Sequence, residues 1–130
     1  MGMYEPYLTY DEYIDMGGNT LPSDNAEDYL KQASRHIDTL TFNRILKYGF
    51  DKLTDFQKEI IKEVTFKLSN FEYENEDLLN SILSGYSING VSMNFNNESW
   101  NITTQNGVAI KTDDYELLSQ TGLTTLSLRI

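Results

Sequence analysis

Acidic side chains fall into three groups whose spacing would suit general acid–base chemistry, in which neighbouring carboxyl groups donate and accept protons. These groups are Asp11 with Asp15, then Glu72, Glu74 and Glu76, and finally Asp113, Asp114 and Glu116. Each group lies at an expected helix start or in a polar linker, where the helix dipole already accounts for carboxylates. We therefore interpret all three groups as structural and predict no catalytic residue.

Metal and cofactor chemistry has few candidate ligands in this chain. Cysteine is absent and His36 is the one histidine, so zinc sites built on several such residues are excluded within a single chain. The run Glu74-Asn75-Glu76-Asp77 hints at calcium, but the EF-hand loop spacing with its central glycine is missing. No glycine-rich phosphate or dinucleotide motif occurs. We predict no metal, no cofactor and no enzymatic activity.

The length of 130 residues is that of one domain, so we expect a single unit over residues 1–130. The net charge of −10 has the opposite sign from that of a duplex-DNA binder. No stretch approaches the roughly 20 apolar residues of a membrane span, and the N-terminus lacks the pattern of a signal peptide. We therefore expect no DNA capture and no membrane partner, and a protein that is intracellular or carried in a particle.

The charge is unevenly distributed along the chain. Residues 1–30 contain seven acids and no base, residues 31–71 contain eight bases and five acids, and residues 72–130 contain eight acids and two bases. Acidic ends therefore flank a mildly basic middle. Two interpretations stay open: the ends neutralise the middle within one subunit, or the ends of one subunit contact the middle of the next.

Helical patterns cover residues 9–84. Capping boxes at Thr9–Glu12 and Thr54–Gln57 mark two helix starts, and Pro22-Ser23-Asp24 marks another. Two apolar stripes at helical spacing predict a long helical hairpin, with Ala26, Leu30, Ala33, Ile37 and Leu40 in the first helix and Phe56, Ile60, Val64, Leu68 and Phe71 in the second. A C-terminal helix is expected over 112–121, capped by Thr112 or Asp113.

Strand patterns follow the helical region. Residues 86–95 alternate around Asn89-Gly90, a dipeptide that favours the type I′ turn, and so predict a β-hairpin. Residues 96–107 stay ambiguous, since Asn106-Gly107 fits either a second hairpin turn or the lead into a helix. The tail 123–130 alternates apolar and polar residues, as does a strand that joins its own sheet or adds to the sheet edge of a partner. The expected fold is mainly α with a small β element: a helical bundle plus a β-hairpin and an extended C-terminal tail.

Four segments taken together resemble the head–tail connector, or adaptor, proteins of long-tailed bacteriophages and related prophages of Gram-positive bacteria. They are Tyr7–Gly18, Ala33–Ile45, Tyr86–Met93 and Leu118–Leu123. They occur in the family's order and span nearly the whole chain. No catalytic motif is part of the resemblance.

The resemblance implies a structural virion protein. Such subunits are helical bundles with a small β element, and they assemble as a homo-oligomeric ring, commonly a dodecamer, beneath the portal protein. The ring extends the DNA channel, through which DNA passes without specific binding, and it provides the attachment platform for the next tail-side connector or tail completion protein. The implied location is the head–tail interface of the virion, with assembly in the host cytoplasm.

The resemblance also implies two binding regions. The C-terminal segment typically grips the portal in this family, which corresponds here to Leu123, Leu126, Leu128, Arg129 and Ile130. The hairpin tip would face the channel or the tail-side partner, and its residues are Ile88, Asn89, Gly90 and Val91. The alternative function is an acidic DNA mimic or inhibitor that occupies a basic partner surface. Its acids would form regular rows, whereas the acids here cluster at helix caps and chain ends.

Overall fold

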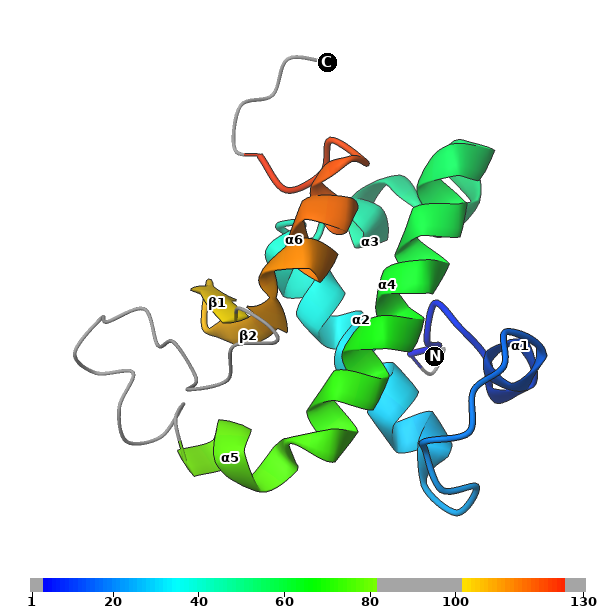
Figure 1. Ribbon diagram of the computed structural model, residues 1–130. Coiled ribbons are helices and arrows are strands. Elements are labelled where there is room, and N and C mark those ends of the chain that lie inside the picture. Colours follow the sequence, from blue (N-terminus) through cyan, green and yellow to red (C-terminus); the bar gives the residue numbers. More distant parts are fainter. Residues whose placement is uncertain (1–3, 82–101, 126–130) are drawn as a thin grey trace.

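The computed structural model describes residues 4–81 and 102–125, which fold mainly as helices with one small β-hairpin (Figure 1). Helices α2 (Ala26–Leu40) and α4 (Asp55–Glu74) pack against each other at the centre, and α6 (Thr112–Ser119) packs on α4. The remaining elements are α1 (Tyr10–Asp15), α3 (Arg44–Tyr48), the 3-10 helix η1 (Phe50–Lys52), α5 (Glu76–Ser81), β1 (Ile102–Gln105) and β2 (Val108–Lys111). The predicted fold class is confirmed.

Both apolar stripes are buried, as predicted, with one exception, and Ala26 and Leu30 of the first stripe belong to a separate core that also contains Tyr13. All five stripe residues of α2 are buried, and so are Ile60, Val64, Leu68 and Phe71 of α4. Phe56 is 55% exposed, so its assignment to the core was wrong. The position lies in the first turn of α4, where Leu53 fills the end of the core and Gln57 turns toward the chain segment after α6.

Two of the four predicted helix starts follow their capping residues. Thr9 and Thr54 accept hydrogen bonds from the backbone N–H groups of Glu12 and Gln57, whose side chains bond back to the cap residues, so both capping boxes are confirmed. Helix α2 begins later than predicted, at Ala26. A turn precedes it, and neither Asp24 nor the actual N-cap residue provides a side-chain cap.

A sharp bend separates α2 from α3. Phe42 and Asn43 both adopt the left-handed backbone conformation, with φ of 57° and 59°. This conformation is uncommon for a non-glycine residue and cannot continue an α-helix. The chain therefore turns sharply after Leu40, and α3 is a separate helix rather than a continuation of α2.

The observed β-hairpin lies at Ile102–Lys111, where β1 and β2 pair antiparallel. Asn106 and Gly107 form its turn, with φ of 52° and 83°, as the type I′ geometry requires. The structure thus selects the hairpin-turn option for Asn106-Gly107. Strand β2 leads directly into α6, so Lys111 occupies the N-cap position and neither Thr112 nor Asp113 does. The hairpin predicted at 86–95 and residues 82–84 lie outside the described residues.

A second, smaller core lies under α1, apart from the main core between α2, α4, α6 and the hairpin. Its centre is Tyr13, which is fully buried and packs with Phe66 at 5.0 Å between ring centroids. The Tyr13 hydroxyl donates to Asn70 Oδ1 at 2.6 Å and accepts from the backbone N–H of Leu21 at 3.0 Å. Gly18 lies so close that a Cβ there would be 2.3 Å from the Tyr13 ring.

No helix in the described part of the chain combines the length and the apolar character that a bilayer span requires.

Candidate functional site

The C-terminal segment after α6 is fastened to one end of the helical bundle. Gln57 in the first turn of α4 donates from Nε2 to the carbonyl oxygen of Thr121 at 2.9 Å. Arg44 at the start of α3 donates from Nη1 to the carbonyl oxygen of Leu123 at 3.3 Å. Two separate elements therefore hold the backbone on either side of Gly122, and they fix the point from which the chain continues.

Local hydrogen bonds shape the same segment. The Thr121 hydroxyl donates to the carbonyl oxygen of Leu118 at 2.7 Å and accepts from the N–H of Leu123 at 3.2 Å. The hydroxyl of Thr124 donates to that of Ser119 at 2.9 Å. Gly122 has φ of 79°, the left-handed conformation that commonly ends helices. The segment is thus a built turn rather than a frayed helix end.

The N-terminal segment is fastened to α2 by a different arrangement. The hydroxyls of Tyr4 and Tyr7 both donate to the carboxylate of Asp38, and the Tyr4 bond measures 2.7 Å. The guanidinium of Arg35 lies 4.0 Å from the centroid of the Tyr4 ring. The Tyr7 ring stacks on Phe50 at 5.3 Å. Asp38 is only 4% exposed, so these hydroxyls satisfy a carboxylate that has little access to water.

The ionisation of this cluster is shifted by burial. Desolvation raises the pKa of Asp38 above its usual range, because it outweighs the hydrogen bonds from the two tyrosines and the charge of Arg35. Burial and the neighbouring carboxylate raise the pKa values of Tyr4 and Tyr7 as well, so both tyrosines stay neutral donors. We call the arrangement of Tyr4, Tyr7 and Asp38 the N-terminal clasp, because neutral donors hold the N-terminal segment on a buried carboxyl of α2.

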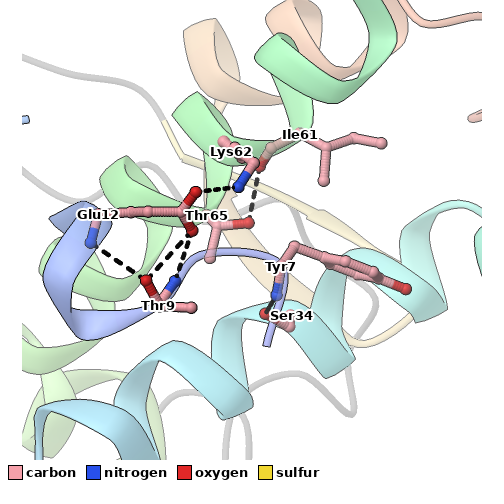
Figure 2. A network of polar contacts seen from close by, with 7 residues as sticks. All are labelled: Tyr7, Thr9, Glu12, Ser34, Ile61, Lys62 and Thr65. Carbon is pink, nitrogen blue, oxygen red and sulfur yellow. Dashed lines mark hydrogen bonds and ion pairs between the residues drawn. The ribbon is translucent and has the colours of Figure 1, made fainter. Parts of the chain in front are cut away.

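Figure 2 shows how the chain between this clasp and α1 is positioned. The backbone N–H of Tyr7 donates to Ser34 Oγ at 3.0 Å, and Lys62 of α4 forms an ion pair with Glu12 of α1. Burial alone would raise the pKa of Glu12, but hydrogen bonds from Lys62 and Thr9 outweigh it and lower the pKa. The capping carboxylate of α1 therefore also ties this helix to the centre of the bundle.

The histidine and one carboxylate of the predicted acidic groups meet between α2 and α4. His36 Nδ1 contacts a carboxylate oxygen of Glu72, and Gln32 Nε2 donates to the other oxygen at 3.0 Å. The Glu72 side chain is buried, whereas that of His36 is partly exposed. Both oxygens of the carboxylate are thus engaged in joining the two helices, which is a structural arrangement.

The other acidic candidates do not assemble into a site. Asp11, Asp15, Glu74, Asp113 and Glu116 are exposed. Glu76 accepts a hydrogen bond from the Tyr29 hydroxyl at 2.8 Å. Asp114 is buried at the start of α6; desolvation raises its pKa, opposed by the charges of Lys67 and Lys111. Within residues 4–81 and 102–125, no group of three or more acidic or histidine side chains could hold a metal ion.

The residues that the family resemblance assigns to binding divide between core and undescribed segments. Leu123 is 7% exposed and belongs to the main core of its own subunit. Leu126, Leu128, Arg129 and Ile130 lie outside the described residues, and so do Ile88, Asn89, Gly90 and Val91. Leu123 is thus part of the core of its own subunit, and the assignment of the other residues to binding stays a prediction.

The residues that hold the two chain ends on the bundle were not predicted from the sequence. Gln57 was identified only as the closing residue of a capping box, and its second contact to Thr121 spans 64 positions in the chain. Asp38 lies off the apolar stripe of α2, yet it is buried. The tyrosines near the N-terminus were a sequence signal for a buried acceptor such as Asp38, because their hydroxyls can donate hydrogen bonds. No sequence feature near Arg44 indicated its hydrogen bond to the carbonyl oxygen of Leu123.

Comparisons of the chain with family models, with curated proteins and with solved structures find no match.

Proposed function

We propose that the chain is the subunit of a head–tail connector of a long-tailed bacteriophage or prophage, a structural protein and not an enzyme. Its support is the resemblance of four segments, in order, to that family, together with a mainly helical fold that carries a small β-hairpin. In this proposal the subunits form a ring between the portal and the next tail-side protein. The ring is part of the virion, and it is assembled in the host cytoplasm.

The single observation that carries the proposal is the fastening of the C-terminal segment. Gln57 and Arg44 hold the carbonyl groups of Thr121 and Leu123, so the residues that follow start from a fixed point on the bundle. The following residues alternate apolar and polar, a pattern suited to adding a strand to the sheet edge of another protein. A fixed starting point reduces the ordering cost of such an interaction.

The charge of the subunit fits a channel through which DNA moves. Each copy carries a net charge of −10, and phosphate groups are repelled by surfaces of the same sign. Acidic groups that face the channel would keep DNA from adhering as it passes. The predicted hairpin tip, Ile88 to Val91, is proposed to face the channel or the tail-side protein.

The test is binding of the chain to the portal protein encoded in the same genome. Replacing Leu126, Leu128 and Ile130 together by serine is expected to weaken binding by at least about tenfold, since the apolar face of the added strand is lost. The matched control is Ser127→Thr, which keeps a polar residue between the apolar positions and is expected to bind as the unchanged chain does. Native mass spectrometry of portal mixtures measures both complexes.

Two outcomes would contradict the proposal. One is equal portal binding by the triple-serine variant, which would remove the role of the C-terminal segment. The other is the absence of any complex between the unchanged chain and the portal. In that case, competition with DNA for a basic protein would favour the acidic mimic instead.

A further inference from the structure

The bend after α2 places a bulky residue where glycine is usual. The backbone N–H of Phe42 donates to the carbonyl oxygen of Thr39 at 3.2 Å. The N–H of Asn43 donates to the carbonyl oxygen of Asp38 at 2.7 Å. This pair of bonds is a Schellman motif, in which the residue after the C-cap is left-handed and most often glycine. Here that residue is Phe42, with φ of 57°, so the helix end carries a backbone strain that glycine would avoid.

Core packing does not account for this strained phenylalanine. Phe42 is 36% exposed, and it belongs to neither of the two apolar cores of the described chain. Its ring centroid lies 5.4 Å from the guanidinium carbon of Arg44, which is a cation–π distance. Residues held in strained conformations concentrate at functional sites, where a side chain is needed in spite of its local cost. The Phe42 ring therefore indicates a role other than core packing.

Arg44 connects the Phe42 ring with the C-terminal segment. The guanidinium that lies beside the ring also donates to the carbonyl oxygen of Leu123 at 3.3 Å. A guanidinium has five N–H donors, and Arg44 forms no ion pair within residues 4–81 and 102–125. An exposed ring and a cation thus lie beside the point from which the chain continues.

The distance along the chain restricts what can cover this place. Leu126 is three residues beyond Leu123, so at most about 11 Å separates their Cα atoms. A protein that binds the chain from residue 126 onward must therefore lie close to Arg44 and to the ring beside it. A molecule that does not bind the C-terminal segment is under no such constraint.

We propose that Phe42 and Arg44 form a second contact with the protein that receives residues 126–130. This inference rests on the proposed connector function, in which that protein is the portal. The chemistry of the pair requires an apolar side chain of the partner on the Phe42 ring and a carboxylate or carbonyl oxygen at the guanidinium. Aromatic residues and arginine are enriched in protein interfaces, as such a contact would require.

The first experiment tests proximity by photo-crosslinking. The full chain carries benzoylphenylalanine in place of Phe42, which keeps an aromatic side chain there, and is irradiated with the portal protein encoded in the same genome. Mass spectrometry is expected to find the chain joined to the portal through position 42. The control carries the same group in place of Met16, which is 44% exposed on α1. Figure 1 shows α1 and the C-terminal segment on opposite sides of α4, so this control is expected to give no portal product.

The second experiment measures affinity for the portal. Phe42→Ala is expected to weaken binding by at least about tenfold, since the apolar half of the contact is lost. Asn43→Gly is the matched control, because it changes the neighbouring left-handed residue but leaves the ring, and it is expected to bind as the unchanged chain does. Thermal unfolding verifies that both variants fold. If Phe42→Ala does not fold, the crosslink from position 42 decides.

Amide exchange of the free chain separates a direct contact from a merely structural role. If the ring only positioned Arg44 for its bond to Leu123, Phe42→Ala would speed exchange at residues 121–125. We expect exchange there to stay unchanged while portal binding weakens. Faster exchange at these residues would overturn the inference.

Three further results would overturn it: no portal product from position 42 in a chain that binds the portal, unchanged portal binding by Phe42→Ala, or crosslinks from position 42 that join only second copies of the chain. Each of these leaves the connector function standing. The absence of any complex between the unchanged chain and the portal would contradict both the connector function and this contact.

Discussion

The two ends of the described chain are fastened to the same bundle by different chemistry. At the N-terminal end, side chains of Tyr4 and Tyr7 meet the side chain of Asp38, so both partners must keep their identity. At the C-terminal end, Gln57 and Arg44 bind backbone carbonyl groups, which every residue possesses. The N-terminal clasp therefore constrains the sequence it holds, whereas the C-terminal fastening constrains only the path of the segment.

The difference predicts a large loss of stability when the carboxylate of the clasp is removed. Asp38→Ala leaves the hydroxyls of Tyr4 and Tyr7 without their acceptor, one of them buried. We expect the free energy of unfolding to fall by about 3 kcal/mol, measured by urea denaturation.

The control for this prediction is Asp28→Ala, which removes an exposed carboxylate from the same helix. Its expected cost is at most about 0.5 kcal/mol, the value of a carboxylate near a helix start. Equal losses in the two variants would show that the clasp contributes nothing beyond the general effect of charge on α2.

A smaller loss of stability is predicted for Gly18→Ala, because Gly18 lies against the Tyr13 ring. In Gly18→Ala the added Cβ would overlap the Tyr13 ring, which is enclosed by the small core and held through its hydroxyl by Asn70. We expect this overpacking to lower the free energy of unfolding by about 2 kcal/mol.

Gly17→Ala serves as a comparison. Its added Cβ would meet nothing within 4 Å, and its cost comes instead from a backbone φ of +92°, which residues with a side chain rarely adopt. For Gly18 the obstacle is contact with carbons of the Tyr13 ring, and Tyr13→Phe keeps those carbons but releases the ring from Asn70. If Tyr13→Phe and Gly18→Ala reduce stability by strictly additive amounts, the hydroxyl has no part in holding the ring against the new methyl group.

The elements of this fold were largely predictable, because helix starts and apolar stripes are local patterns. The two capping boxes and nine of the ten stripe positions are where the sequence indicated. The buried polar residues were not predicted. Thr65 and Ser34 are buried because their hydroxyls bond carbonyl groups of their own helices, at 2.7 Å in both cases. Polar residues whose hydroxyls bond within their own helix can be buried, but they are absent from a pattern of apolar residues.

The contacts of the candidate site were less predictable, for a related reason. Contacts such as that of Gln57 with Thr121 join positions far apart in sequence, and only the packing of α6 against α4 brings them together. Asp38 is a second case of a contact over a long sequence distance, since its partners lie 34 and 31 positions away. Its burial was hidden from the periodicity of α2 because its partners come from a segment outside any helix.

The smallest predicted effect sharpens the comparison at the C-terminal end. Gln57 has two roles, since its Oε1 accepts from the N–H of Thr54 and its Nε2 donates to the carbonyl oxygen of Thr121. Gln57→Glu keeps the capping box, for which glutamate is equally suited, but it removes the donor to Thr121. We expect a loss of about 1 kcal/mol, and faster amide exchange confined to residues after α6. Gln57→Ala removes both roles and should also speed exchange in the first turn of α4. If Gln57→Glu leaves exchange after α6 unchanged, Arg44 alone suffices to hold the segment, and the two ends of the chain differ even more than their contacts suggest.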